Sequence, residues 1–262
     1  MLWLINSANG LTKYMNQCVI AILDILGTKG IWTEQSIDKY FHVIDKVEKD
    51  LNFWKNHFDS LTKKKPFEFD FVTFSDTLII TIINKEKHDY FFDELIEGFS
   101  QFILGVFQSY LADNFFLRGA ISFGDIEKRG SHFVGPAVDD AAEYFELQDM
   151  IGICLTPKTT IAMEYSIEWN LKYNRKKIDE YVIKYKTPLK NKMEFDLYQI
   201  NWAKQFLDPV EGTEQMNPAS RISRFFSVRN IPIIAATKFS NTLKFFDYAI
   251  KKAIEQPALR SL

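Results

Sequence analysis

The feature that most constrains the fold is the run Cys18–Leu26, CVIAILDIL, in which Asp24 is the single charged residue. Such a continuous apolar run is typical of a strand that is buried on both faces of a sheet. An ionised carboxylate at the end of a buried strand costs several kcal/mol unless a cation, a hydrogen-bond donor or water meets it. We therefore expect another part of the chain to supply a partner for Asp24.

Helix-like and strand-like segments alternate along the rest of the chain. Apolar residues at helical spacing predict helices over about 33–61, 89–111 and 137–149, and Pro157 is placed to begin another. Further strands are predicted in 67–74, 77–83, 115–126, 132–135, 151–155, 180–189 and 193–202. This order predicts an α+β fold of the split βαβ, ferredoxin-like kind, with an antiparallel or mixed sheet and helices packed on one face. Residues 17–202 would form the main domain, and residues 203–262 a helical extension packed on or beside it.

A second acidic residue, Asp76, lies between two strand-like runs. FEFDFVTF and TLIITII are separated only by Ser75 and Asp76, which predicts a tight hairpin with an acidic tip. In the predicted sheet, Asp24 and Asp76 converge at the ends of neighbouring central strands. Magnesium prefers oxygen ligands, so this pair, completed by the backbone carbonyl of Ile25, favours a metal site for phosphoryl chemistry. In the alternative interpretation, Asp24 caps a neighbouring turn and Asp76 is an ordinary hairpin residue.

Composition narrows the class of protein. The 262 residues are 47% hydrophobic and carry a formal net charge of −2, so the chain has material for a sizeable core and no overall attraction to nucleic acid. No apolar run approaches the roughly 20 residues of a membrane span, and the opening MLWLINSANG lacks the basic leader of a secretory signal. Cys18 and Cys154 lie in apolar runs, as buried free thiols do. We expect a cytoplasmic protein that neither inserts into a membrane nor binds nucleic acid.

Four sequence segments, in this order, carry a family resemblance: AILDILGTKG, FVTFSDTLIIT, LRGAISFGDI and FVGPAVDDAAEYFE. Together they resemble the class III nucleotide cyclase domain over about Gln17 to Trp202. More narrowly, RGAISFGD and GPAVDDAAEYFE are similar to the bacterial pyrimidine cyclases of the Pycsar antiphage system.

The resemblance implies a reaction, a cofactor and partners. The chain would convert a pyrimidine nucleoside triphosphate, UTP before CTP, into cyclic UMP or cyclic CMP and pyrophosphate. Two Mg²⁺ or Mn²⁺ ions would be bound by Asp24 and Asp76. The family further implies a homodimer with shared active sites, and a separately encoded effector that senses the cyclic nucleotide during phage infection.

A lysine-containing segment follows the family pattern less closely. In LKNKMEFDLY, Lys190 and Lys192 have the spacing of the purine cyclases' VKGKG segment. The resemblance implies that Lys190, rather than Lys192, binds the triphosphate. A compact ammonium group suits such a phosphate contact, although lysines that flank a hairpin are also commonly solvated.

The nucleotide-base pocket departs from the purine-cyclase pattern. Four residues before Asp76, where adenylate cyclases have a base-reading lysine, this chain has Val72. His132 occupies the return-strand position at which purine cyclases use a carboxylate or a small polar residue. The resemblance therefore suggests His132, Thr73 and Phe71 as candidates for contact with a pyrimidine.

In purine cyclases one helix carries the residues that stabilise the transition state, and the corresponding segment of this chain also departs from their pattern. We call this segment the transition-state helix. Asp139 and Glu143 stand where purine cyclases have an asparagine and an arginine four residues apart. Arg118 is the candidate for the missing cation, because an arginine on a central strand needs anions or carbonyls around it. A structural ion pair from Arg118 to Asp139 or Glu143 is the other interpretation. The acidic replacements leave open a catalytically inactive cyclase-like domain that binds nucleotide, and a purine cyclase with an unfamiliar pocket.

Overall fold

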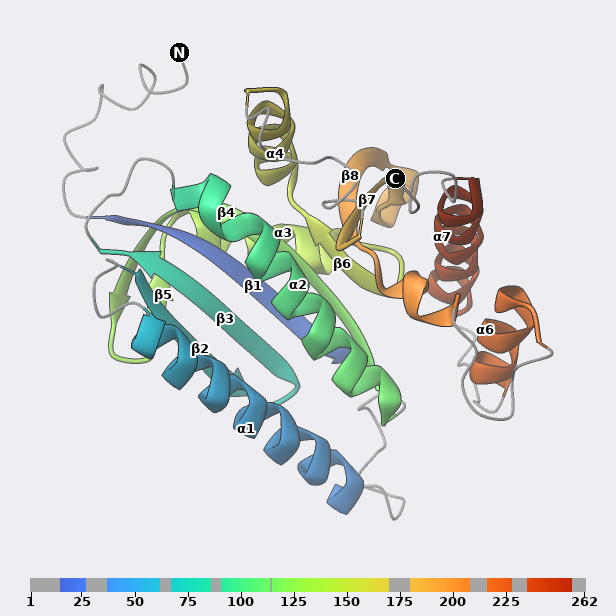
Figure 1. Cartoon of the computed structure of the whole chain (residues 1–262), viewed down its shortest axis with the longest axis horizontal. Coiled ribbons are helices and arrows are strands. Elements are labelled where there is room, and N and C mark those ends of the chain that lie inside the picture. Colours follow the sequence, from blue (N-terminus) through green and yellow to red (C-terminus); the bar gives the residue numbers. More distant parts are fainter. Residues whose placement is uncertain are drawn as a thin grey trace.

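The computed structural model describes residues 15–26, 37–61, 67–85, 91–113, 115–169, 180–207, 216–227 and 235–255. Figure 1 shows the arrangement of the helices around a central sheet. The elements in chain order are β1 (Asn16–Leu26), α1 (Ile37–Leu61), β2 (Phe67–Phe74), β3 (Thr77–Asn84), α2 (Phe91–Ala112), β4 (Phe116–Arg129), β5 (His132–Val134), α3 (Pro136–Leu147), β6 (Gly152–Leu155), α4 (Pro157–Trp169), β7 (Val182–Pro188), the 3₁₀ turn η4 (Lys190–Lys192), β8 (Glu194–Ile200), the 3₁₀ helix η5 (Trp202–Phe206), α6 (Pro218–Ser227) and α7 (Ala236–Glu255).

One mixed sheet of eight strands organises the chain. The strand order is β2-β3-β1-β4-β6-β8-β7, and β5 pairs with β4 outside this path. β4 and β6 run parallel, whereas the other paired strands run antiparallel. The predicted α+β class is therefore confirmed, as are the mixed sheet and the tight hairpin of β2 and β3.

β1 is apolar on both faces because both faces are covered. The odd-numbered positions from Val19 to Ile25 join the main core with α1 and α2, which lie in front of the sheet in Figure 1. Cys18, Ile20 and Ile22 instead pack in a second cluster with residues of α3. The prediction that the helices pack on one face is therefore wrong for α3. The apolar side chains on the second face of β1 also have to be removed from water, and α3 does this.

β4 departs from its prediction in length, and its Gly119 lies where β1 leaves no room for a side chain. Glu127 to Arg129 pair with β5, so the predicted end of this strand at residue 126 is wrong, and Gly130, at φ 59°, begins a short turn. Extra strand pairing satisfies the backbone groups that a longer loop would leave to water. At Gly119, an added Cβ would stand 2.6 Å from the backbone oxygen of Ile22. A side chain at this position would push β4 away from β1.

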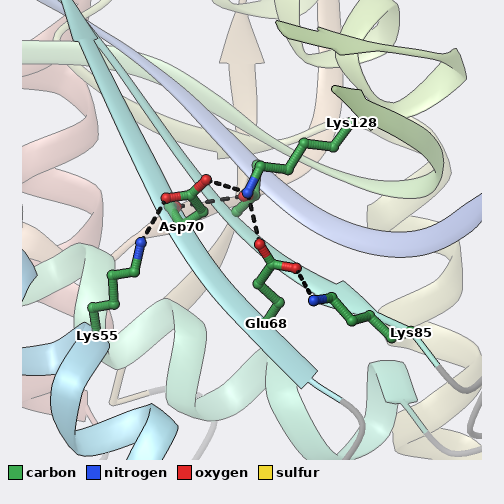
Figure 2. A network of polar contacts seen from close by, with 6 residues as sticks. Lys55, Glu68, Asp70, Lys85 and Lys128 are labelled. Carbon is green, nitrogen blue, oxygen red and sulfur yellow. Dashed lines mark hydrogen bonds and ion pairs between the residues drawn. The ribbon is translucent and has the colours of Figure 1, made fainter. Parts of the chain in front are cut away.

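A network of ion pairs joins β4 to β2 at the end of the sheet where β1 begins (Figure 2). Lys128 of β4 contacts Asp70 and lies 2.6 Å from Glu68, both on β2. Lys55 of α1 lies 3.0 Å from Asp70, and Lys85 lies 2.5 Å from Glu68. The two carboxylates therefore have cations around them, and the ammonium of Lys128, with a side chain 19% exposed, connects the two strands.

The C-terminal helix α7 contributes to the same core as the sheet. Trp202 is buried, stacks on Phe107 with ring centroids 5.4 Å apart, and meets Phe245 of α7 at 5.8 Å. Phe245 and Phe246 are themselves 0% and 1% exposed. None of the helices in the described ranges combines the length and apolar character that crossing a membrane requires.

Candidate functional site

The sequence predicts a partner for the buried carboxylate of Asp24, and in the structure that partner is the guanidinium of Arg118. The two residues stand directly opposite each other in the register of β1 and β4. The Arg118 guanidinium donates a hydrogen bond of 2.9 Å to Asp24 Oδ2, and the side chains are 11% and 18% exposed. The guanidinium also lies over the ring of Phe145 of α3, 5.5 Å from its centroid. This pair is therefore a largely buried salt bridge on the sheet face that α3 covers.

Asp76 is held against the same end of β1. It lies in the two-residue turn between β2 and β3, where Ser75 adopts φ 56°. The backbone N–H of Ile25 donates a hydrogen bond of 2.9 Å to the carbonyl of Asp76, and the Tyr40 hydroxyl donates one of 2.9 Å to the carbonyl of Ser75. The hairpin tip is thus fixed next to Asp24 from two sides, by β1 and by α1.

The electrostatic balance at Asp24 is unfavourable to the ionised carboxylate. Burial raises its pKa, and the nearby carboxylate of Asp76 raises it further. Arg118 opposes both effects by charge and by its hydrogen bond, and Lys238 opposes them by charge, yet the net shift is upward. A carboxylate that is still short of positive charge beside a second carboxylate is well suited to bind an additional cation.

Two lysines bring positive charge to the same place from distant parts of the chain. Lys190 is exposed on the turn between β7 and β8, where Asn191 and Lys192 adopt φ 65° and 63°. Lys238 lies in the first turns of α7 and is half-buried. Burial lowers the pKa of Lys238, and the charges of Arg118 and Lys190 lower it further, although Asp149 and Asp24 act in the opposite direction. Arg118 and Lys190 therefore both lie within electrostatic reach of Lys238.

Lys238 was missed by the sequence reasoning. It stands in ATKFSN, a segment without any motif, and its place depends on how α7 docks against the sheet. Ile25 has its side chain in the main core, so only its backbone is available to a metal ion.

Thr73 and Phe71, predicted to contact a pyrimidine, lie on the opposite face of the sheet. The Thr73 hydroxyl donates a hydrogen bond of 3.0 Å to Glu48 of α1. Phe71 packs against the main core. Because side chains alternate along a strand, neither faces Asp24 within this chain.

His132, the third pyrimidine-contact candidate, lies at the far end of β4. It is exposed and pairs with Arg129, which stands 11 residues along β4 from Arg118. At about 3.3 Å per residue, this separation is about 36 Å. The chain itself does not bring His132 to the two aspartates.

α3 presents Asp139 and Glu143 outward. Both are exposed, whereas Asp140 accepts hydrogen bonds from Ser122 at 2.7 Å and Thr156 at 2.5 Å. Arg118 pairs with Asp24 rather than with Asp139 or Glu143. The two acidic positions are thus available to another molecule.

The donor set fits Mg²⁺ or Mn²⁺. Asp24 and Asp76 supply carboxylate oxygens, and the strand end supplies backbone carbonyls, which are hard oxygen ligands. No group of three or more histidine, cysteine or acidic side chains with a metal-binding arrangement occurs in the part of the chain that the structure describes. A metal here would therefore need further oxygen ligands from water or from a phosphate-bearing substrate.

No model of a known protein family matches the chain, and no curated protein matches its sequence significantly.

Proposed function

We propose that this chain is a metal-dependent nucleotide cyclase that acts on a pyrimidine nucleoside triphosphate, UTP before CTP. Its product is the 3′,5′-cyclic monophosphate, released with pyrophosphate. The observation that carries the proposal is the meeting of Asp24 and Asp76 at one strand end, with Arg118 and Lys238 in electrostatic reach of Asp24. Lys190 is in turn within electrostatic reach of Lys238. Two carboxylates can bind metal ions, and the neighbouring cations can bind phosphate groups. This combination is typical of a site for a metal–triphosphate complex.

The reaction closes a ring within one nucleotide. The 3′-oxygen of the ribose forms a bond to the α-phosphorus, the bond from that phosphorus to the oxygen bridging to the β-phosphate breaks, and the hydroxyl proton passes to water. Two divalent ions, when bound, stabilise the attacking oxygen and the growing charge on the phosphates. Asp24 and Asp76 would hold these ions, while Arg118 and Lys190 would orient the triphosphate and offset its charge.

The proposal includes a homodimer. His132, Asp139 and Glu143 are all exposed: His132 lies far from the aspartates of its own chain, and Asp139 and Glu143 point outward from α3. A second copy would bring such residues to the site, as the class III resemblance implies. The cyclic nucleotide would then act on a separately encoded effector in antiphage defence.

Product analysis tests the proposal. The purified protein is incubated with each of ATP, GTP, CTP and UTP in the presence of Mn²⁺, and the products are identified by mass spectrometry. We expect cyclic UMP to predominate, and we expect Asp76→Asn to abolish it without loss of fold. Asp247→Asn, at an exposed position on α7, is the matched control and should retain activity. Cyclic AMP or cyclic GMP as the main product would contradict the pyrimidine assignment.

An inactive nucleotide-binding domain is the second candidate. It is favoured by the acidic character of Asp139 and Glu143, because carboxylates on the transition-state helix would repel phosphate. Metal-dependent binding of nucleotide without any cyclic product, measured on the same preparation, would establish this alternative in place of the cyclase.

A further inference from the structure

The first turns of α7 are hydrogen-bonded to the residues that lead into β6, the strand that pairs with β4 at Arg118. The side-chain amide of Asn241 donates a hydrogen bond of 2.9 Å to the carbonyl of Asp149. The backbone N–H of Ile151 donates one of 2.9 Å to the hydroxyl of Thr242, which is 0% exposed. Gly152, the next residue, stands opposite Arg118 in the parallel pairing of β4 and β6. The helix is therefore docked at the end of the sheet that carries the two aspartates.

This docking determines where Lys238 lies. Lys238 is three and four residues before Asn241 and Thr242, so the three share one face of α7. Thr242 also donates a hydrogen bond of 2.6 Å to the carbonyl of Lys238, which ties the two turns together. The face of α7 that meets the sheet thus delivers a cation beside Arg118.

The position of Lys238 is electrostatically unfavourable in the free protein. Its side chain is half-buried, the charges of Arg118 and Lys190 act against its protonated form, and it forms no ion pair with a carboxylate in the described ranges. Arg118 is only 9% exposed, and its Nε has no hydrogen-bond acceptor among the described residues. Asp149 and Asp24 offset only part of these effects on Lys238, so its pKa remains lowered. The buried Nε of Arg118 and the ammonium of Lys238 are therefore donors that a phosphate oxygen would satisfy.

We propose that Lys238 is a third phosphate-binding cation of the nucleotide site, contributed by the C-terminal helix α7. The inference rests on the proposed function, and it assigns to α7 a direct contact with the triphosphate. Its ligand class is a linear polyphosphate, either the triphosphate of the nucleotide or the pyrophosphate product. The consequence is that the site is complete only when α7 is docked.

Binding measurements on the whole protein test the inference. Wild type, Lys238→Gln and Lys238→Arg are titrated calorimetrically in Mn²⁺ with 3′-deoxy-UTP, which lacks the attacking hydroxyl, and, separately, with inorganic tripolyphosphate. We expect Lys238→Gln to bind both about 10-fold or more weakly, because a charge-assisted phosphate contact is lost, and Lys238→Arg to recover part of the affinity. Lys244→Gln, an exposed position on the same helix, should bind as wild type does.

A stability measurement separates phosphate binding from a structural role. The ligand-free Lys238→Gln variant should melt at the same temperature as wild type or higher, because burial and the charges of Arg118 and Lys190 together outweigh the attraction of Asp149 and Asp24 for the ammonium. Unchanged affinity of Lys238→Gln for both ligands would overturn the inference. So would a lowered melting temperature in both Lys238 variants with affinity lost in parallel.

The binding measurements, read together with the product analysis on the same preparations, distinguish this inference from the proposed function. Lys238-dependent binding of tripolyphosphate by a protein that forms no cyclic product would support the site and refute the cyclase. Cyclic UMP formation with Lys238→Gln indistinguishable from wild type in affinity would support the cyclase and refute the role of Lys238. A wild-type protein that binds neither ligand would refute both.

Discussion

The salt bridge between Asp24 and Arg118 should show a large coupling energy and a small net contribution to stability. At 2.9 Å, two unit charges attract by about 6 kcal/mol at an effective dielectric constant of about 20. The pKa of Asp24 is nevertheless raised, first by burial, so the attraction does not fully repay the desolvation of this carboxylate. The pair as a whole should therefore stabilise the fold little.

Breaking the pair from one side is a different perturbation. Arg118→Met leaves the Asp24 carboxylate buried without its main cation, which costs about 3–5 kcal/mol in a fully buried pair. Because the side chains are 11% and 18% exposed, we expect a loss of about 2–4 kcal/mol in the free energy of unfolding at pH 7. The double variant Asp24→Asn, Arg118→Met should lose about 1 kcal/mol or less, because neither charge remains.

Urea unfolding at pH 7, followed by circular dichroism for all four proteins, measures this coupling. The penalty in Arg118→Met should shrink as the pH falls, because the unpaired carboxyl, whose pKa lies above its ordinary value, is then protonated. Millimolar Mn²⁺ should restore part of the lost stability in Arg118→Met but not in Asp24→Asn, if the aspartates bind metal. Single-variant effects that add to the double-variant effect within about 0.5 kcal/mol would refute the reasoning.

Three further predictions concern other parts of the fold. Gly119→Ala should destabilise the protein by about 1–3 kcal/mol in urea unfolding, because its Cβ would stand 2.6 Å from a backbone oxygen of β1; an unchanged midpoint would refute the close approach. Burial acts to raise the pKa values of Glu68 and Asp70, but hydrogen bonds and charges from Lys128 and its neighbours outweigh it, so both are net lowered. The stability that these two carboxylates contribute should be fully present at neutral pH and should fall as the pH drops below about 4. The free energy of unfolding should decrease less at low pH in Lys128→Met than in wild type. Burial raises the pKa of Cys154 to about 12, so this thiol should resist labelling by a maleimide at pH 8 until urea unfolds the chain.

The central part of the fold was accessible from sequence because its signals are local. The continuous apolar run of β1 and the two-residue gap before Thr77 predict a central strand and a tight hairpin, and both are present. The packing of α3 on the second face of the sheet was not predicted. The apolar residues on both sides of β1 already indicated that both faces are buried. Periodicity identifies a helix, but it does not say which side of a sheet the helix reaches.

The sequence predicted the residues of the candidate site only where those residues lie on neighbouring strands. Asp24, Asp76 and Arg118 come together through strand register, which the sequence segments constrain. Lys238 reaches them through the tertiary docking of α7, which combines core packing of Phe245 with the hydrogen bonds made by Asn241 and Thr242. No spacing rule connects residues so far apart in the chain. Family resemblance does not help either, because the motif segments end before α7.

The network that joins β2 to β4 means that the two ends of the sheet respond differently to ionic strength. The contacts of Lys55 and Lys85, whose side chains are 38% and 60% exposed, are screened first, since the Debye length shortens to about 3 Å in 1 M salt. Aromatic packing around Trp202 carries no charge and is not weakened by that screening. The Asp24–Arg118 ion pair at the other end of the sheet is less exposed and is screened less. At high salt concentration, the end where β1 begins should therefore lose more of its electrostatic stabilisation.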